Sequence, residues 1–396
     1  MTIGLISPTL RSQVSRGSVR TAISRGFFVS LFTTATIFSS AFSDVAIASE
    51  TRGYVVSWFD VAGYADPKQR DCPHGLNRTG EDFPQAVSQL IRLGYSREDV
   101  NRIVHDAYNP DNLQIIINRG RINGRPANVY AHPESVPDPH IKVGEGRFGY
   151  GFDLDGKIKP GDFIDPESGA RGIDNNLYRA IACFSLTREP SQPGLRATFS
   201  GGAWGALVER RPAHLIEISG IDNFENDEDV VVRYYVSLDH ITLVSGAVAA
   251  DQTMRVDPDP RWQNVVHGKI KNHVLTTEAF DLNLLGDPFW VQSYQFRQAR
   301  LRLQFKPDGT AKGIVGGYLT WFPFYWSYAS QGWGIDVTGF DIPGLYYALK
   351  RLADAFPDRK TGENTAISAA YEIDVVPAII SHTVRHEKGF ERGLAK

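Results

Sequence analysis

Alternating apolar and polar residues run through the second half of this chain of 396 residues and limit the folds open to it. In RQARLRLQF, residues 297–305, the alanine, both leucines and the phenylalanine share one face, while arginine and glutamine take the other. A period of two is that of a strand with one buried face. Similar runs recur towards the C-terminus with short turns between them. The pattern predicts a mainly β chain folded as an antiparallel β-sandwich of jelly-roll type.

Helices are predicted on both sides of this β region. Residues 83–93 and 96–107 form a small N-terminal helical part, with Ser96 as an N-cap. Residues 113–124 (LQIIINRGRING) predict a strand and a tight Asn-Gly turn. One C-terminal amphipathic helix, residues 343–356, places Leu345, Leu349 and Leu352 on one face. The resulting division is a signal peptide (1–48), an N-terminal α+β region (49–144), an acidic loop region (145–192) and the β-sandwich with its helix (193–396).

The first 48 residues have the composition of a secretory signal. Arginines precede an apolar run at residues 27–42, and the small residues Ala46 and Ala48 end the segment. A membrane anchor is the alternative, but the run is shorter than the roughly 20 residues that span a bilayer. We expect cleavage after Ala48, a mature N-terminus near Ser49 and a protein that is periplasmic or secreted. No later segment is apolar enough to predict a transmembrane span.

Two cysteines remain after this cleavage, Cys72 and Cys183. An even number of cysteines in an exported chain favours a disulfide bond. The alternative is a pair of buried free thiols. Since CxxC is absent, the sequence indicates neither a cysteine zinc site, nor covalent haem, nor a thioredoxin-type redox pair.

Acidic turns in two places predict cation sites. Calcium takes six to eight oxygen ligands from Asp, Asn and backbone carbonyls on tight turns. The stretch GFDLDGKIKPGDFIDPESGARGIDNN offers five such side chains: Asp153, Asp155, Asp162, Asp174 and Asn175. A second GIDN begins another acidic turn, whose candidate ligands are Asp222, Asn223, Asp227 and Asp229. The alternative is that these residues serve turns alone, with Asp174 as the N-cap of a helix starting at Asn175.

The densest aromatic segment suggests a surface for a ligand. Flat rings suit sugar faces and protein partners. The candidate platform consists of Trp321, Tyr325, Trp326 and Trp333. A core strand with its turn is the alternative. His382 and His386 have a spacing that zinc uses, but solvated histidines explain them equally well.

Composition excludes some functions without choosing one. A net charge of −3 gives no electrostatic reason to expect nucleic acid as a partner. GxSxG, P-loop and Rossmann glycine patterns are absent. The leading hypothesis is an exported protein that binds Ca²⁺ structurally and presents loops to an unknown ligand or protein partner. The alternatives are an extracytoplasmic hydrolase that uses the acidic-loop carboxylates, and a structural component of an envelope or assembly.

Overall fold

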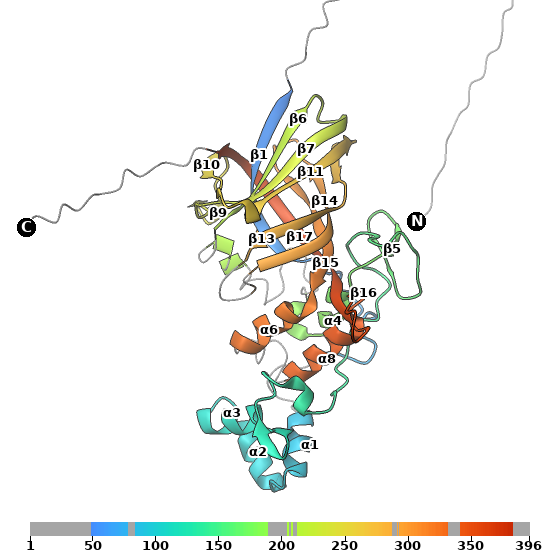
Figure 1. Cartoon of the computed structure of the whole chain (residues 1–396), viewed down its shortest axis with the longest axis vertical. Helices are drawn as coiled ribbons and strands as arrows, with labels where there is room; N and C mark the ends of the chain where they lie inside the picture. The colour runs from blue at the N-terminus through green and yellow to red at the C-terminus, as the bar shows by residue number, and fades with distance from the viewer. Residues whose placement is uncertain are drawn as a thin grey trace, which may run out of the picture. The chain divides into compact units, whose positions relative to one another are not determined.

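The described part of the chain is built around a closed antiparallel β-barrel (Figure 1). The computed structural model describes residues 49–77, 84–188, 204–205, 207–208, 212–286, 291, 293–331 and 341–382. The predicted signal peptide therefore lies outside the described residues. Eight strands within the described ranges follow one another around the barrel. In order they are β1 (Glu50–Val61), β6 (His214–Ile221), β7 (Asn226–Val236), β11 (Gln263–Lys271), β12 (Val274–Thr277), β14 (Ser293–Phe305), β15 (Ala311–Thr320) and β17 (Asn364–Ser381).

A barrel is found where a sandwich was predicted, because the first and last strands of the sheet pair with each other. β1 is hydrogen-bonded to β6 on one side and to β17 on the other, and this second pairing closes the ring. Sandwiches and closed barrels both bury one face of every strand, so period-two alternation is the same in the two folds. The pairing also makes β1 part of the barrel, although the sequence placed it in the N-terminal α+β region.

Apolar side chains fill the barrel, so its interior is a packed core. β11 alternates residue by residue: Val266 and Ile270 are buried, whereas Val265 and Lys269 are exposed. Aromatic rings contribute much of the filling, and Phe296 packs against Tyr371 with ring centroids 5.7 Å apart. A small barrel filled in this way has little space for a ligand at its centre. Space for a ligand is therefore expected at the ends of the barrel and on its outer surface.

Shorter strands extend the barrel or form ribbons beside it. β13 (Phe280–Leu285) pairs with β14 next to β12, β10 (Gln252–Arg255) pairs with β17 in parallel, and β16 (Ala355–Pro357) pairs with β17 near its start. Separate two-stranded ribbons within the described residues are formed by β2 (Gly120–Ile122) with β3 (Arg125–Ala127), β4 (Phe163–Ile164) with β5 (Arg171–Ile173), and β8 (Leu243–Val244) with β9 (Ala247–Val248). Three short 3₁₀ turns are η1 (Pro133–Ser135), η2 (Ser185–Thr187) and η4 (Pro260–Trp262).

The N-terminal helical part contains three helices, α1 (Pro84–Arg92), α2 (Arg97–His105) and α3 (Pro110–Ile117). Ser96 caps α2 as predicted, accepting a hydrogen bond from the backbone N–H of Asp99 at 3.0 Å. The strand expected from residue 113 is wrong. Pro110 stands at the start of α3, where a missing N–H costs nothing, and Asn109 caps that helix. The Asn123–Gly124 turn is confirmed, and both residues have positive φ.

Three further helices pack around the segment where β15 ends and β17 begins. They are α4 (Asn176–Ile181), α6 (Trp321–Gln331) and α8 (Ile342–Leu352), and each contacts β17. α8 confirms the predicted amphipathic helix, with Leu345 and Leu349 fully buried and Leu352 partly buried. It ends earlier than predicted, because residues 355–357 pair with β17 as β16.

Candidate metal site

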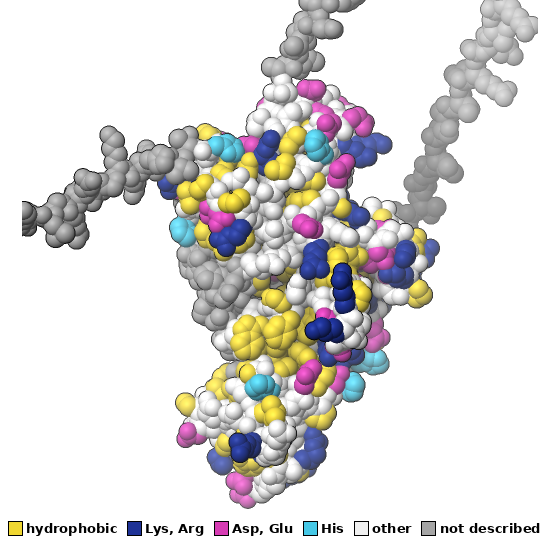
Figure 2. Space-filling view, viewed as in Figure 1, with side chains coloured by type: hydrophobic (Ala, Val, Ile, Leu, Met, Phe, Trp, Pro, Cys, Tyr) yellow, Lys and Arg dark blue, Asp and Glu magenta, His cyan; other side chains and the backbone are white. Residues whose placement is uncertain are grey.

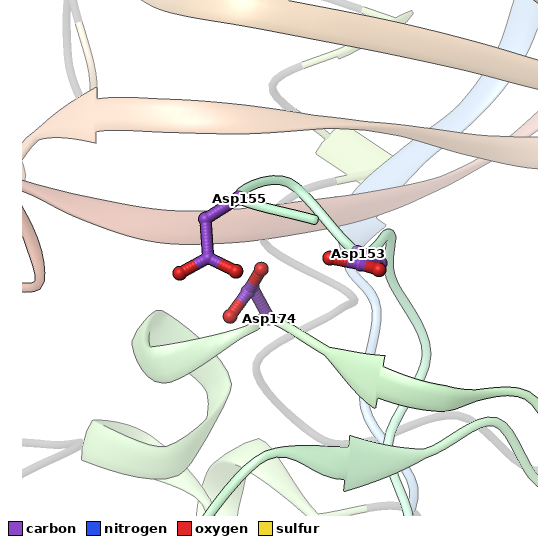
Figure 3. A group of neighbouring side chains, drawn as sticks. All are labelled: Asp153, Asp155 and Asp174. Carbon is purple, nitrogen blue, oxygen red and sulfur yellow. The ribbon is translucent and has the colours of Figure 1, made fainter. Parts of the chain in front are cut away.

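Three aspartates from two segments bring their carboxylates together beside the barrel (Figure 3). One oxygen from each of Asp153, Asp155 and Asp174 lies within 4.8 Å of the others. Oxygens on opposite sides of a Ca²⁺ ion lie about 4.6–5.2 Å apart, twice the usual bond length, and those around Mg²⁺ are closer. Three carboxylate oxygens this close together could bind one cation between them. Within the described residues, no other group of three His, Cys, Asp or Glu side chains comes this close.

Backbone hydrogen bonds hold each carboxylate in place. Asp153 accepts from the N–H of Gly156 at 2.7 Å, and Asp155 from that of Lys157 at 2.9 Å. Asp174 accepts from the N–H of Leu154 at 2.8 Å, which joins the two segments directly. The bonds to Asp153 and Asp155 are local turn bonds of the kind that Asp side chains often make. They preset the geometry of the cluster without any ligand.

The GIDNN motif shapes the other side of the cluster. Gly172 has a φ of 81°, and a Cβ there would lie 2.9 Å from the backbone oxygen of Lys157, so only glycine fits. Asn175, not Asp174, is the N-cap of α4 and accepts from the N–H of Tyr178 at 3.2 Å. The cap shift corrects the predicted helix start and leaves Asp174 free to face the acidic loop.

Burial and like charges make this cluster costly to ionise. Burial, with the charges of Asp155, Asp162 and Asp354, raises the pKa of Asp174 to about 6, against the bond from Leu154. The ion pair with Lys159 holds the pKa of Asp155 below its usual value. A bound cation would offset the repulsion that Asp174 experiences.

Comparison with protein-family models, curated proteins and solved structures found no match to this chain. The helices of the described ranges include none that is both long and apolar enough to cross a membrane.

The other predicted calcium ligands have different surroundings. Asp162 accepts a hydrogen bond from the backbone N–H of Lys159 and adds negative charge near Asp174 without joining the close group. Asn175 is fully buried, and its amide donates to the carbonyl oxygens of Ala62 and Tyr150, both at 2.9 Å. Asn175 therefore fastens α4 to the barrel, and its side-chain oxygen accepts from the backbone N–H groups of Tyr178 and Ala370.

The second acidic turn uses its oxygens within itself. Asp227 accepts from the backbone N–H groups of Asp222, Asn223 and Asp229, and so closes the β6–β7 turn. Asp229 instead faces His267, with 2.7 Å between its carboxylate oxygen and Nδ1. These contacts are what the turn-only alternative expects.

The predicted disulfide bond joins Cys72 and Cys183, whose Cα atoms are 5.7 Å apart.

The predicted aromatic platform is only partly on the surface. Trp321 and Tyr325 are buried in the core, while Trp326 is 44% exposed. Phe322 of the same helix is also exposed, and Figure 2 shows hydrophobic side chains gathered over α6. Trp333 lies outside the described residues.

Of the two paired histidines, the structure describes His382. His382 Nε2 lies 2.8 Å from a carboxylate oxygen of Glu217. His386 falls outside the part of the chain that the structure describes.

Sequence reasoning missed two groups near the cluster. Asp354, just after α8, accepts from the amide of Asn176 at 3.0 Å and from the hydroxyl of Ser368 at 2.6 Å, and burial raises its pKa. Arg300 of β14 donates to the backbone oxygens of Asp153 and Leu154. Neither has a local signal, because each is more than 120 positions along the chain from the nearest of the three aspartates.

We expect the unfolding free energy of the metal-free protein to fall as pH rises from about 4 to about 6. Asp174 has a folded pKa of about 6, above the ordinary value of about 3.9 for the unfolded chain. The folded state therefore binds more protons in this window, and the stabilising contribution present below pH 4 is lost through pH 6. Urea unfolding in chelator at several pH values measures the fall. Asp174→Asn should make it shallower, whereas equal slopes in both proteins would contradict the raised pKa.

Proposed function

We propose that this protein binds one Ca²⁺ ion through Asp153, Asp155 and Asp174, and that the ion fastens the acidic loop to the segment between β5 and α4. The observation that carries the proposal is the convergence of the three carboxylate oxygens within 4.8 Å around a buried aspartate. Free carboxylates so close repel one another, and a cation converts that repulsion into attraction. The role is structural, since the ligands come from two segments that the ion would tie together.

The predicted export of the chain supports this choice of ion. The predicted signal at residues 1–48 and the Cys72–Cys183 disulfide both fit an oxidising compartment outside the cytoplasm. Calcium modules that work outside cells bind with dissociation constants of about 10⁻⁴–10⁻³ M. A site with three carboxylates and one competing lysine, Lys159, suits that range of affinity.

Calcium is expected to stabilise the purified protein. At a free concentration about one hundred times Kd, one ion bound only to the folded state raises the unfolding free energy by about 2.7 kcal/mol. Thermal melts with Ca²⁺ and with chelator measure this difference. Asp155→Asn should abolish it, because the variant loses a charged ligand but keeps an oxygen for the turn bond from Lys157.

Two further variants identify the site. Asp227→Asn, in the second acidic turn, should leave the calcium response unchanged; if it alone abolished the response, the ion would bind there instead. Lys159→Met should enlarge the response, because the ion no longer displaces an ammonium group from Asp155. Equal melting temperatures with Ca²⁺ and with chelator would refute a cation role for the cluster.

Hydrolysis by the same carboxylates is the second candidate. Asp174 has a raised pKa and its neighbour Asp155 a lowered one, the arrangement that assigns an acid and a base in many hydrolases. Retaining glycosidases place two carboxyls about 5–5.5 Å apart. However, neither carboxylate lines the larger cavities of about 380 and 740 Å³. Hydrolysis of a polysaccharide that persists in chelator and is lost in Asp174→Asn would favour this candidate over a structural ion.

A further inference from the structure

A cavity of about 380 Å³ lies at the end of the barrel where β1 begins. Its lining comes from the start of β1 and from the turns that join β6 to β7, β11 to β12 and β14 to β15. Alternate hairpin turns of an up-and-down barrel lie at one end. α6 and α8 follow β15 and precede β17, so they belong to the opposite end. The cavity is therefore separate from the acidic cluster and shares no residue with it.

Aromatic rings form the inner wall of the cavity. Tyr54 and Phe305 stack with centroids 6.2 Å apart, and Phe224 meets Phe305 edge-on at 5.4 Å. Pro307 and Pro377 add apolar surface. A volume within the roughly 300–1,000 Å³ of small-molecule sites, with such walls, suits one apolar chain or ring.

Basic groups surround the mouth of this cavity. The Lys306 ammonium has no ion pair or hydrogen bond within the described residues, and His273 lines the cavity beside it. Arg52 lies over the ring of Phe224 at 5.5 Å and pairs with Glu50, both side chains about half exposed. The nearby Asp308 accepts hydrogen bonds from Thr310 of its own turn, and these bonds, with a smaller effect of the Lys306 charge, lower its pKa.

A tyrosine hydroxyl is present among the residues that line the cavity. Tyr54 is only 4% exposed as a residue, and its hydroxyl has no hydrogen-bond partner within the described residues. The hydroxyl keeps some accessible surface, because it is not among the enclosed polar atoms that lack a partner. A ligand oxygen in the cavity would accept a hydrogen bond from it.

We propose that this cavity binds a small amphipathic carboxylate, with its apolar part against Tyr54, Phe224 and Phe305 and its anionic head near Lys306 and Arg52. Apolar walls, an unpartnered phenol and an unpaired ammonium call for these two ligand features together. A neutral apolar ligand would leave the basic mouth unused, and a small inorganic anion would leave the rings exposed to water.

Decanoate is the test ligand, and 1-decanol, which has the same chain without charge, is its control. Isothermal titration calorimetry of the full mature protein should show one decanoate bound per chain. Lys306→Met should weaken decanoate binding about fivefold, the effect of losing about 1 kcal/mol of ion pairing at an exposed site. Binding of 1-decanol should be weaker and unchanged by this variant.

Further variants test whether decanoate binds in this cavity and not elsewhere on the protein. Lys269→Met removes an exposed lysine on the outer face of β11 and should leave decanoate binding unchanged. Tyr54→Phe keeps the ring but removes the hydroxyl, and should weaken decanoate binding. Asp155→Asn should not alter it, so the result is independent of calcium. Absence of saturable binding, or equal losses in Lys306→Met and Lys269→Met, would overturn the proposal.

Discussion

Replacing Leu349 with alanine is expected to lower the unfolding free energy by about 2–5 kcal/mol. Leu349 lies on α8 with no exposed surface, among helices and strands of the main core. Truncation removes buried methyl groups and leaves a cavity whose walls relax only in part. α8 contacts α4, α6 and β17, so a shift towards one neighbour opens a gap beside another. Urea unfolding monitored by circular dichroism measures the loss.

Leu352→Ala is the matched control for Leu349→Ala. Both variants remove the same atoms from the same helix, but Leu352 is only partly buried. Its loss should be clearly smaller. Equal losses would show that the depth of burial does not set the effect, and a change below about 0.5 kcal/mol for Leu349→Ala would place that residue on the surface.

The face of α8 was predictable because burial follows the 3.6-residue period within one segment. The same holds for β11 and β14, whose alternation predicts which side chains face inward. The sequence predicted a strand from residue 113 and missed α3, although Pro110 occupies the first helical position, where proline fits best. Closure of the barrel was not predictable. It depends on the pairing of β1 with β17, and no local pattern in either strand specifies its partner.

The acidic cluster was also predictable from the sequence only in part. Asp-Gly and Asp-Asn turns predicted where carboxylates gather, and the structure brings Asp153, Asp155 and Asp174 together. It was not predictable that Asn175 would take the cap position and release Asp174 towards the loop. Asp354, from a distant part of the chain, adds to the charge of the cluster only through the packing of α8 and β17 against α4.

Loss of the disulfide is expected to lower the unfolding free energy by about 2–5 kcal/mol. Cys72 and Cys183 are 111 positions apart, so their bond closes a long loop and removes many conformations from the unfolded chain. The bond also holds the segment after β1 against the end of α4. There the N–H of Asn77 donates to the carbonyl oxygen of Cys183 at 2.7 Å. The variant Cys72→Ala/Cys183→Ala, compared with the parent by urea unfolding, measures the effect.

An ion pair near the disulfide also links the two segments that Cys72 and Cys183 join. Arg188 and Asp71 are both nearly buried, with 2.6 Å between their charged groups, and Arg188 also donates to the carbonyl oxygen of Ala182. Removing both sulfurs takes away the contact of Arg188 with Cys72 Sγ at 3.2 Å but not its bonds to Asp71 and Ala182. We therefore expect the folded ends of the loop to keep their positions and the loss to reflect mainly the freed unfolded chain. Reduction of the parent with dithiothreitol should give the same loss as the double variant. A difference below about 0.5 kcal/mol between oxidised and reduced protein would mean that the packing around Arg188 alone holds the two segments together.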